Sequence, residues 1–164
     1  MITAAVIIYN LGMDKVDRKL LALLQDDADR PLNELAEAVN LTATPCWKRI
    51  QRMQNEGVIR KKVVLCDPAK LNLGLTAFVA VRTTQHNEQW LRKFAAAVQS
   101  IPEIVEAYRM SGEIDYMLRI VVSDIHGYDT VYKKLIRAVE LADVSSSFAM
   151  ERIKYSTALP VDFA

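Results

Sequence analysis

The sequence has few of the residues that mark several common protein classes. Its two cysteines, Cys46 and Cys66, cannot form a disulfide framework, and they fit a reducing, cytoplasmic setting. Its five glycines are not clustered into a phosphate-binding loop. The apolar opening, residues 1–12, has no basic lead and is too short for a membrane span of about 20 residues. We therefore expect neither a secreted nor a membrane protein, and residues 1–12 form an extension that is either native or added.

Charge is nearly balanced over the chain but unevenly distributed along it. The net charge is +1, and 51% of the residues are hydrophobic and 25% charged, which is typical of a folded protein. Residues 14–45 carry four basic and seven acidic side chains, a balance of −3. Residues 46–62 carry six basic side chains and one acidic, a balance of +5. Because a concentrated basic stretch attracts phosphate, residues 46–62 are the first candidate for a nucleic-acid contact.

Apolar spacing predicts three short helices near the start of the chain. Residues 14–25 and 31–39 carry apolar side chains at helical spacing. Thr42 is a suitable N-cap for a third helix, which Gly57 would end. Residues 58–66 are rich in valine and isoleucine with charges between them, a pattern that predicts a basic strand pair. Together these elements predict a winged helix-turn-helix domain, which we assign to residues 13–66.

The pattern changes after a linker. Turn-forming residues at 67–74 predict that linker, and strands and helices then alternate as βαβ and βαβ again, with the halves about 40 residues apart. The predicted strands are 75–83, 103–110, 115–122 and 143–153, and the predicted helices are 87–99 and 124–139. This order predicts a ferredoxin-like βαββαβ domain over residues 75–164, in which both helices cover one face of an antiparallel sheet. The whole chain is therefore expected to be α+β, and the apolar strands call for a second subunit on the other face.

The third helix has an apolar seam and an opposite polar face. At 100° per residue Cys46, Ile50 and Met53 fall together. The opposite side carries hydrogen-bond donors and no acid, which suits contact with phosphates and major-groove base edges. A solvated face on a core helix is the usual explanation of such a pattern, but the helix-turn-helix setting and the basic hairpin favour DNA. The candidate contacts are Thr42, Thr44, Lys48, Gln51, Arg52, Asn55, Arg60 and Lys61.

Four stretches of the sequence resemble the Lrp/AsnC (feast/famine) family of transcription regulators. The first is "DKVDRKLLALLQDDADRPLNELAEAVNLTATPCWKRIQRMQNEGVI", residues 14–59, and "LCDP" follows it. The others are "SGEIDYMLRI", residues 111–120, and "SSFAMERIKYSTALP", residues 146–160. The resemblance covers nearly all of residues 14–160. The forms "TPCWKRIQRM" and "SSFAMERIKYSTALP" are most similar to the cysteine-detoxification branch of the family.

The resemblance implies both partners and a ligand. It implies binding to double-stranded DNA, dimers that pair their C-terminal sheets and assemble further into octamers, and an amino-acid effector between dimers, with no other cofactor. The family's G-x-x-D ligand loop corresponds to residues 112–115, so Ser111, Gly112 and Asp115 are the candidate effector-binding residues. Glycine permits close backbone approach and a carboxylate can receive an α-ammonium group; a lone G-x-x-D would otherwise be a plain hairpin turn. Cysteine is the first candidate effector, and leucine, proline or another metabolite comes next.

Two other classes of protein are alternatives. An amino-acid-metabolising enzyme would need Cys46 or Cys66 as nucleophile beside His86 or His126, yet the predicted elements hold these residues apart. The separations of 20, 20 and 40 residues also lack the short paired spacing of a zinc site. An effector-only assembly protein would lack the basic helix face. We therefore expect a regulator without catalysis or metal, and we expect Trp47 and the aromatic residues of the later helices in the core.

Overall fold

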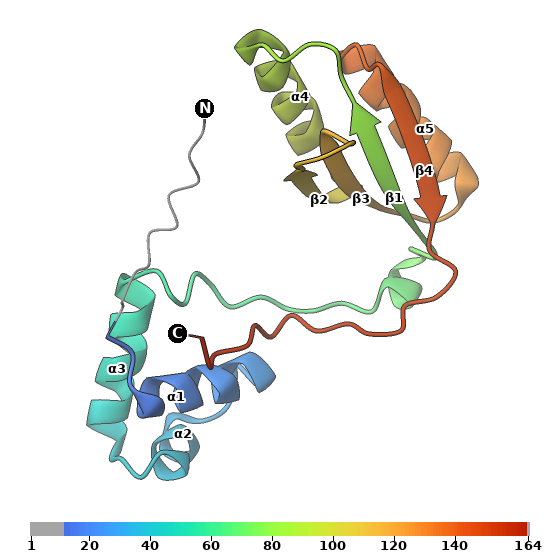
Figure 1. Ribbon diagram of the computed structural model, residues 1–164. Coiled ribbons are helices and arrows are strands. Elements are labelled where there is room, and N and C mark those ends of the chain that lie inside the picture. Colours follow the sequence, from blue (N-terminus) through green and yellow to red (C-terminus); the bar gives the residue numbers. More distant parts are fainter. Residues whose placement is uncertain (1–11, 164) are drawn as a thin grey trace. The chain divides into compact units, whose positions relative to one another are not determined.

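The computed structural model describes residues 12–163, which fold into two compact units (Figure 1). One unit comprises residues 12–64 and 154–163, and the other comprises residues 65–153. The assignment of 154–163 differs from the sequence-based domain boundaries, which placed these residues with the sheet domain. Except for Gly12, the predicted extension of residues 1–12 lies outside the described residues.

The first unit contains three helices: α1 (Lys15–Asp26), α2 (Leu32–Ala38) and α3 (Ala43–Asn55). A capping box begins α1, because the Asp14 carboxylate accepts the Asp17 N–H and the Asp17 carboxylate accepts the Asp14 N–H. Helix α3 begins after Thr42, as predicted, although the threonine hydroxyl makes no capping hydrogen bond. Gly57 follows the helix with φ +76°, a left-handed conformation that glycine adopts without strain. These elements form the predicted helix-turn-helix.

The core of the first unit is small. Cys46 and Met53 are fully buried and Ile50 is partly buried, so the predicted seam of α3 is confirmed. Trp47 is 50% exposed, so its predicted place in the core is wrong: it lies one residue beyond the seam, on the solvent side of the helix. The buried apolar cluster consists of Leu20, Leu21, Leu35, Ala36, Val39, Cys46 and Met53.

The strand pair predicted over residues 58–66 does not form among the described residues. Residues 60–67 run as an exposed, extended segment without ladder hydrogen bonds. The apolar side chains of Val63, Val64 and Leu65 are 58%, 88% and 57% exposed. A strand needs a neighbour to pair its backbone N–H and C=O groups, and this segment has none within the described part of the chain. β-propensity alone therefore predicted a wing that this single chain does not build.

The second unit is a two-layer sandwich. After the 3-10 turn η1 (Pro68–Leu71), the chain forms β1 (Leu75–Arg82), α4 (Glu88–Ser100), β2 (Ile104–Arg109), β3 (Tyr116–Val122), α5 (Ile125–Ala138) and β4 (Asp143–Phe148). The sheet is antiparallel with strand order β2-β3-β1-β4, and both helices lie on one face (Figure 1). This is the predicted ferredoxin-like arrangement. Strand β4 ends at Phe148 rather than at residue 153, and its pairing with β1 runs from Asp143 opposite Arg82 to Phe148 opposite Ala77.

The two faces of the sheet differ in burial. Side chains directed at the helices, such as Val79, Leu118 and Ile120, are at most 1% exposed. On the open face Phe78 of β1 is 44% exposed and Tyr108 of β2 is 53% exposed. An ion pair between Arg119 and Glu106 crosses the same face. The open face thus has aromatic surface that residues 12–163 leave exposed.

Candidate DNA-binding face and effector loop

The exposed side of α3 carries most of the predicted DNA contacts. Thr44, Lys48 and Asn55 are exposed on the helix, and Thr42 is exposed at its N-terminus. Gln51 is partly buried, and its amide donates to Gln54 at 2.8 Å. Arg60 and Lys61 follow on the extended segment and are exposed. The structure thus brings five candidates onto one helix surface, and Arg60 and Lys61 continue it.

Arg52 differs from the other candidates because a buried carboxylate holds its guanidinium. One terminal nitrogen lies 2.5 Å from Oδ2 of Asp17, whose side chain is fully buried. The Nε atom of Arg52 is buried and has no hydrogen-bond partner within the described residues; the Glu56 carboxylate lies 4.0 Å away. The side chain remains 41% exposed, so part of the guanidinium faces solvent. Arg52 therefore joins α3 to α1 as well as contributing charge to the surface.

Arg49 completes this network. Its Nη1 atom lies 2.9 Å from Asp17 Oδ1 and 2.7 Å from Asp14 Oδ2. Asp17 thus accepts from one arginine at each carboxylate oxygen and also caps α1. We name Asp14, Asp17, Arg49 and Arg52 the α1–α3 ion network. It fixes the rotation of α3, and with it the direction of the exposed face.

The charges of the network are mutually stabilised. The Asp17 N–H, and after it the Arg49 guanidinium, hold the pKa of the Asp14 carboxyl below its ordinary value. Hydrogen bonds to Asp17, then to Asp14, raise the pKa of Arg49. Both residues are therefore charged at neutral pH. This network was not predicted, although one signal was present in the sequence: Asp17 lies three and four residues before Leu20 and Leu21, on the apolar side of α1.

The predicted effector loop connects β2 to β3. Gly112 has φ +114°, which side-chain-bearing residues rarely adopt, and an added Cβ would meet no atom within 4 Å. Glycine is thus required here by backbone conformation rather than by crowding. Ser111 and Gly112 are exposed. The Asp115 carboxylate is partly exposed, and its Oδ2 accepts the Thr83 N–H at 2.8 Å. Asp115 therefore fixes the end of β1.

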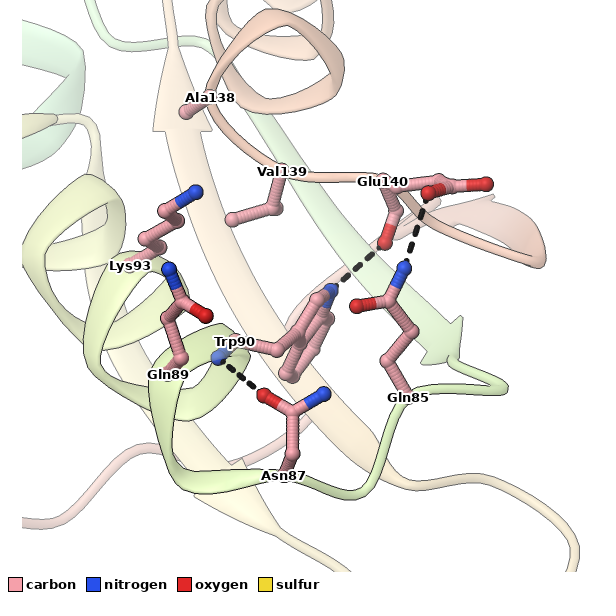
Figure 2. A pocket seen from close by; sticks show the side chains of 8 residues that line it. All are labelled: Gln85, Asn87, Gln89, Trp90, Lys93, Ala138, Val139 and Glu140. Atoms are coloured by element: carbon pink, nitrogen blue, oxygen red, sulfur yellow. Dashed lines mark hydrogen bonds between the residues drawn. The ribbon is translucent and has the colours of Figure 1, made fainter.

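A hollow of about 160 Å³ lies at the start of α4, close in sequence to Thr83 (Figure 2). The Trp90 indole N–H donates to the Glu140 carbonyl at 2.8 Å, and the Gln85 amide donates to the Glu140 carboxylate at 2.9 Å. Besides these paired groups, the Lys93 amine and the Gln89 amide line the hollow. The lining residues are Gln85, Asn87, Gln89, Trp90, Lys93, Ala138, Val139 and Glu140. Trp90 stacks on Phe94 at 5.0 Å and is 4% exposed, so it is a core residue, as predicted.

The four residues considered for catalysis differ in burial: Cys46 is buried, whereas Cys66, His86 and His126 are exposed. Burial raises the pKa of the Cys46 thiol, which disfavours the reactive thiolate. Cys46 belongs to the first unit, whereas His86 and His126 are exposed in the second unit. Residues 12–163 contain no cluster of three or more His, Cys, Asp or Glu side chains that could hold a metal ion. Among the helices of this described region, none is both long enough and apolar enough to cross a membrane.

A helix-turn-helix unit with a face of hydrogen-bond donors, joined to a separate α/β sandwich, defines a DNA-binding regulator with a second domain. The AsnC-type helix-turn-helix domain matches residues 13–54, and the Lrp/AsnC ligand binding domain matches residues 76–159. The DNA-binding transcriptional activator DecR of Escherichia coli (strain K12) is 52% identical over 151 residues, which cover 92% of this chain and 99% of DecR. The chain belongs to the Lrp/AsnC family of transcriptional regulators, which confirms the resemblance seen in the sequence.

Solved structures agree with this assignment. An AsnC family transcriptional regulator from Agrobacterium tumefaciens has a TM-score of 0.89 at 52% identity, over 92% of this chain and 99% of its own. A transcriptional regulator from Neisseria meningitidis, solved as a complex with L-Met, has a TM-score of 0.86 at 32% identity, over 92% of this chain and 97% of its own. Because the family consists of transcriptional regulators, the enzyme alternative is set aside.

Proposed function

We propose that this protein binds duplex DNA as a dimer at an imperfect palindrome and that a small amino acid changes that binding. The observation that supports DNA contact best is the exposed face of α3, where Thr44, Lys48 and Asn55 extend donors into solvent. Two such helices related by a two-fold axis would enter major grooves about one helical turn apart, or a multiple of it. Thr42 and Gln51 extend the contact surface along the helix, and Arg60 and Lys61 would contact the flanking phosphates.

Asp17 supports this proposal by positioning the face. Its carboxylate pairs with Arg49 and Arg52 on α3, so the rotation of the recognition helix is tied to α1. Arg52 then has two roles: one nitrogen is bound to Asp17, and the exposed part of the guanidinium remains for a phosphate or base. We expect Lys48 to be the simpler contact, because it is exposed and makes no side-chain hydrogen bond or ion pair in the described chain.

The open face of the sheet supports the dimer. Phe78 and Tyr108 are about half exposed on it, and a second copy would remove this apolar surface from water. Phe78→Asp places a charge in the middle of this face without altering the helix side of β1. We expect that variant to be monomeric by light scattering at micromolar concentration, while the wild type is a dimer or larger. A monomeric wild type would contradict the proposal; octamers formed from dimers would extend it.

The effector loop supports amino-acid binding. Gly112 leaves backbone exposed, Ser111 adds an exposed hydroxyl, and Asp115 offers a carboxylate for the α-ammonium group. The ligand-binding family of residues 76–159 and the L-Met complex of the Neisseria relative favour the same class of ligand. Cysteine remains the first candidate from the sequence resemblance. Methionine becomes the second, ahead of leucine and proline.

DNA footprinting and a thermal-shift screen of the twenty amino acids test the two halves of the proposal. Protection should cover two half-sites spaced by about one helical turn or a multiple of it. A ligand at 100 times its dissociation constant should add about 2.7 kcal/mol of stability. Asp115→Asn should abolish this shift, because it removes the charge while keeping an oxygen that can accept the Thr83 N–H. Glu113→Gln is the matched control, since Glu113 is an almost fully exposed acid in the same loop. Equal responses in both variants would disprove the site.

A further inference from the structure

A side chain of helix α1 forms two hydrogen bonds with the backbone of a residue far along the chain. The Gln25 side-chain amide donates to the Leu159 carbonyl at 3.0 Å, and its oxygen accepts the Leu159 N–H at 2.7 Å. One carboxamide thus satisfies both backbone groups of one residue, as a neighbouring strand would. The two residues are 134 positions apart in sequence. Figure 1 shows the red end of the chain running beside α1.

A second contact lies two residues further along. Val161 packs against the buried cluster of the first unit, whereas the Leu159 side chain is 74% exposed. The segment is therefore held by backbone hydrogen bonds at position 159 and by an apolar side chain at position 161. Between them Pro160 has a fixed φ and disfavours the helical region for Leu159. A turn precedes the contact between Gln25 and Leu159, and in it the Ser156 hydroxyl accepts the Ala158 N–H.

Because residues 154–163 belong to the first unit, the chain passes between the two units twice. The first crossing is near residue 65, and the second is near residue 153, after strand β4. A chain that crosses twice encloses the extended connections in a closed loop, which removes freedom that a single linker would leave. Releasing both Leu159 and Val161 would open that loop and leave the buried residues of the two clusters in place.

We propose that α1 carries a docking site for residues 156–161 of the same chain, and that the docked segment couples the sheet unit to the DNA-binding unit. The occupant is this chain's own segment because a covalent connection from β4 supplies it at high local concentration. The coupling half rests on the proposed function: an effector bound by the sheet unit acts on DNA binding through β4 and the docked segment. The docking half stands independently of any ligand.

Hydrogen exchange on the full-length protein tests the docking. The Leu159 amide should be protected in the wild type and should exchange freely in Gln25→Ala. Leu159→Pro removes the same N–H, and Pro160 already favours an extended backbone at position 159 that a proline adopts. Leu159→Ala is the control, because it keeps both backbone groups and changes only an exposed side chain. A freely exchanging Leu159 amide in the wild type would overturn the proposal.

A double-mutant cycle measures the same contact by stability. Gln25→Ala and Leu159→Pro should each lower the folding equilibrium constant of the first unit by roughly three- to tenfold. Together they should lower it no further than Gln25→Ala alone, because Gln25→Ala removes both hydrogen bonds and Leu159→Pro removes one of these two. Fully additive effects would mean that Gln25 and Leu159 act separately, which would also overturn the docking.

The coupling is tested by the ratio of DNA dissociation constants with and without the amino acid that stabilises the wild type. Ratios of about 5 to 150 are typical of coupled sites, and Leu159→Pro should bring the ratio to within about twofold of one. Leu159→Ala should keep the wild-type ratio. An unchanged ratio in Leu159→Pro would refute the coupling. A protected Leu159 amide in a wild type that responds to no amino acid would refute both the coupling and the proposed effector function, while the docking stands.

Discussion

The two units are held together by different means. The sheet unit buries thirteen apolar residues in one cluster between its helices and its sheet. The DNA-binding unit buries seven, and it also buries the charged side chain of Asp17. A unit with so small a core has little hydrophobic stabilisation to spare. The α1–α3 ion network and the contact between Gln25 and Leu159 therefore supply part of the stabilisation that apolar packing supplies in the sheet unit. The ion network lies beside the surface proposed to contact DNA.

The largest expected effect tests the apolar side of this comparison. Leu118→Ala removes a fully buried side chain from the sheet unit and should lower its stability by about 3–4 kcal/mol. Each unit has one tryptophan, Trp47 in the first and Trp90 in the second, so fluorescence can follow each separately. The Trp90 transition should shift to lower denaturant while the Trp47 transition stays in place. Equal shifts of both would show that the units unfold as one.

The next effect tests the ionic side. Asp17→Asn removes the charge that Arg49 and Arg52 share, and it should lower the stability of the DNA-binding unit by about 2 kcal/mol. The cost stays below that of a fully buried pair because both arginines reach solvent and can be hydrated. The unfolding transition followed by Trp47 fluorescence measures this loss of stability. Asp29→Asn is the control, an exposed acid in the same unit, and it should leave that transition unchanged.

A smaller effect separates the surface of α3 from its network. Lys48→Ala should weaken DNA binding by about 1 kcal/mol and reduce the salt slope by about one, with no change in the Trp47 transition. Arg52→Ala should lower both DNA affinity and stability, since Arg52 also pairs with Asp17. Titrations of DNA at several salt concentrations, run alongside unfolding curves, compare the two variants. A loss of stability in Lys48→Ala would place Lys48 in the network as well.

The smallest effect is on the pH dependence of stability. The folded-state pKa of Asp14 lies below its ordinary value of 3.8, so its contribution is present above that value and is lost as pH falls through the folded-state pKa. Asp14→Asn keeps an N-cap residue but cannot titrate. Between about pH 5 and about pH 3 the Trp47 midpoint should therefore fall less in the variant than in the wild type. Parallel curves would mean that Asp14 does not contribute.

Local patterns predicted most of the fold. Apolar spacing located the five α-helices of residues 12–163, and the βαββαβ order gave the sheet topology, because both follow from periodicities that a sequence displays directly. The seam of Cys46 and Met53 was predicted for the same reason. The wing over residues 58–66 was predicted wrongly because strand propensity cannot supply the neighbour that a strand must pair with.

The site was predicted less completely, since its missing parts are contacts between residues far apart in sequence. Arg52 stood out as an exposed donor, but its pairing with Asp17, 35 residues earlier, has no local signature beyond an acid on an apolar face. The two bonds between Gln25 and Leu159 leave no pattern at all. The residues of the effector loop came from a family motif, and the structure adds the left-handed backbone of Gly112 as a physical reason for one of them.

The contact between Gln25 and Leu159 also affects the order in which the protein can be made. Domains form during synthesis from the N-terminus onward, so α1, α2 and α3 leave the ribosome first and can pack early. The segment that completes their unit emerges only after the entire sheet unit has been translated, and the contact spans 134 positions. During translation the nascent helix-turn-helix therefore has the Gln25 amide and the site for Val161 open. Of these two units, the DNA-binding unit starts to form before the sheet unit and is completed after it.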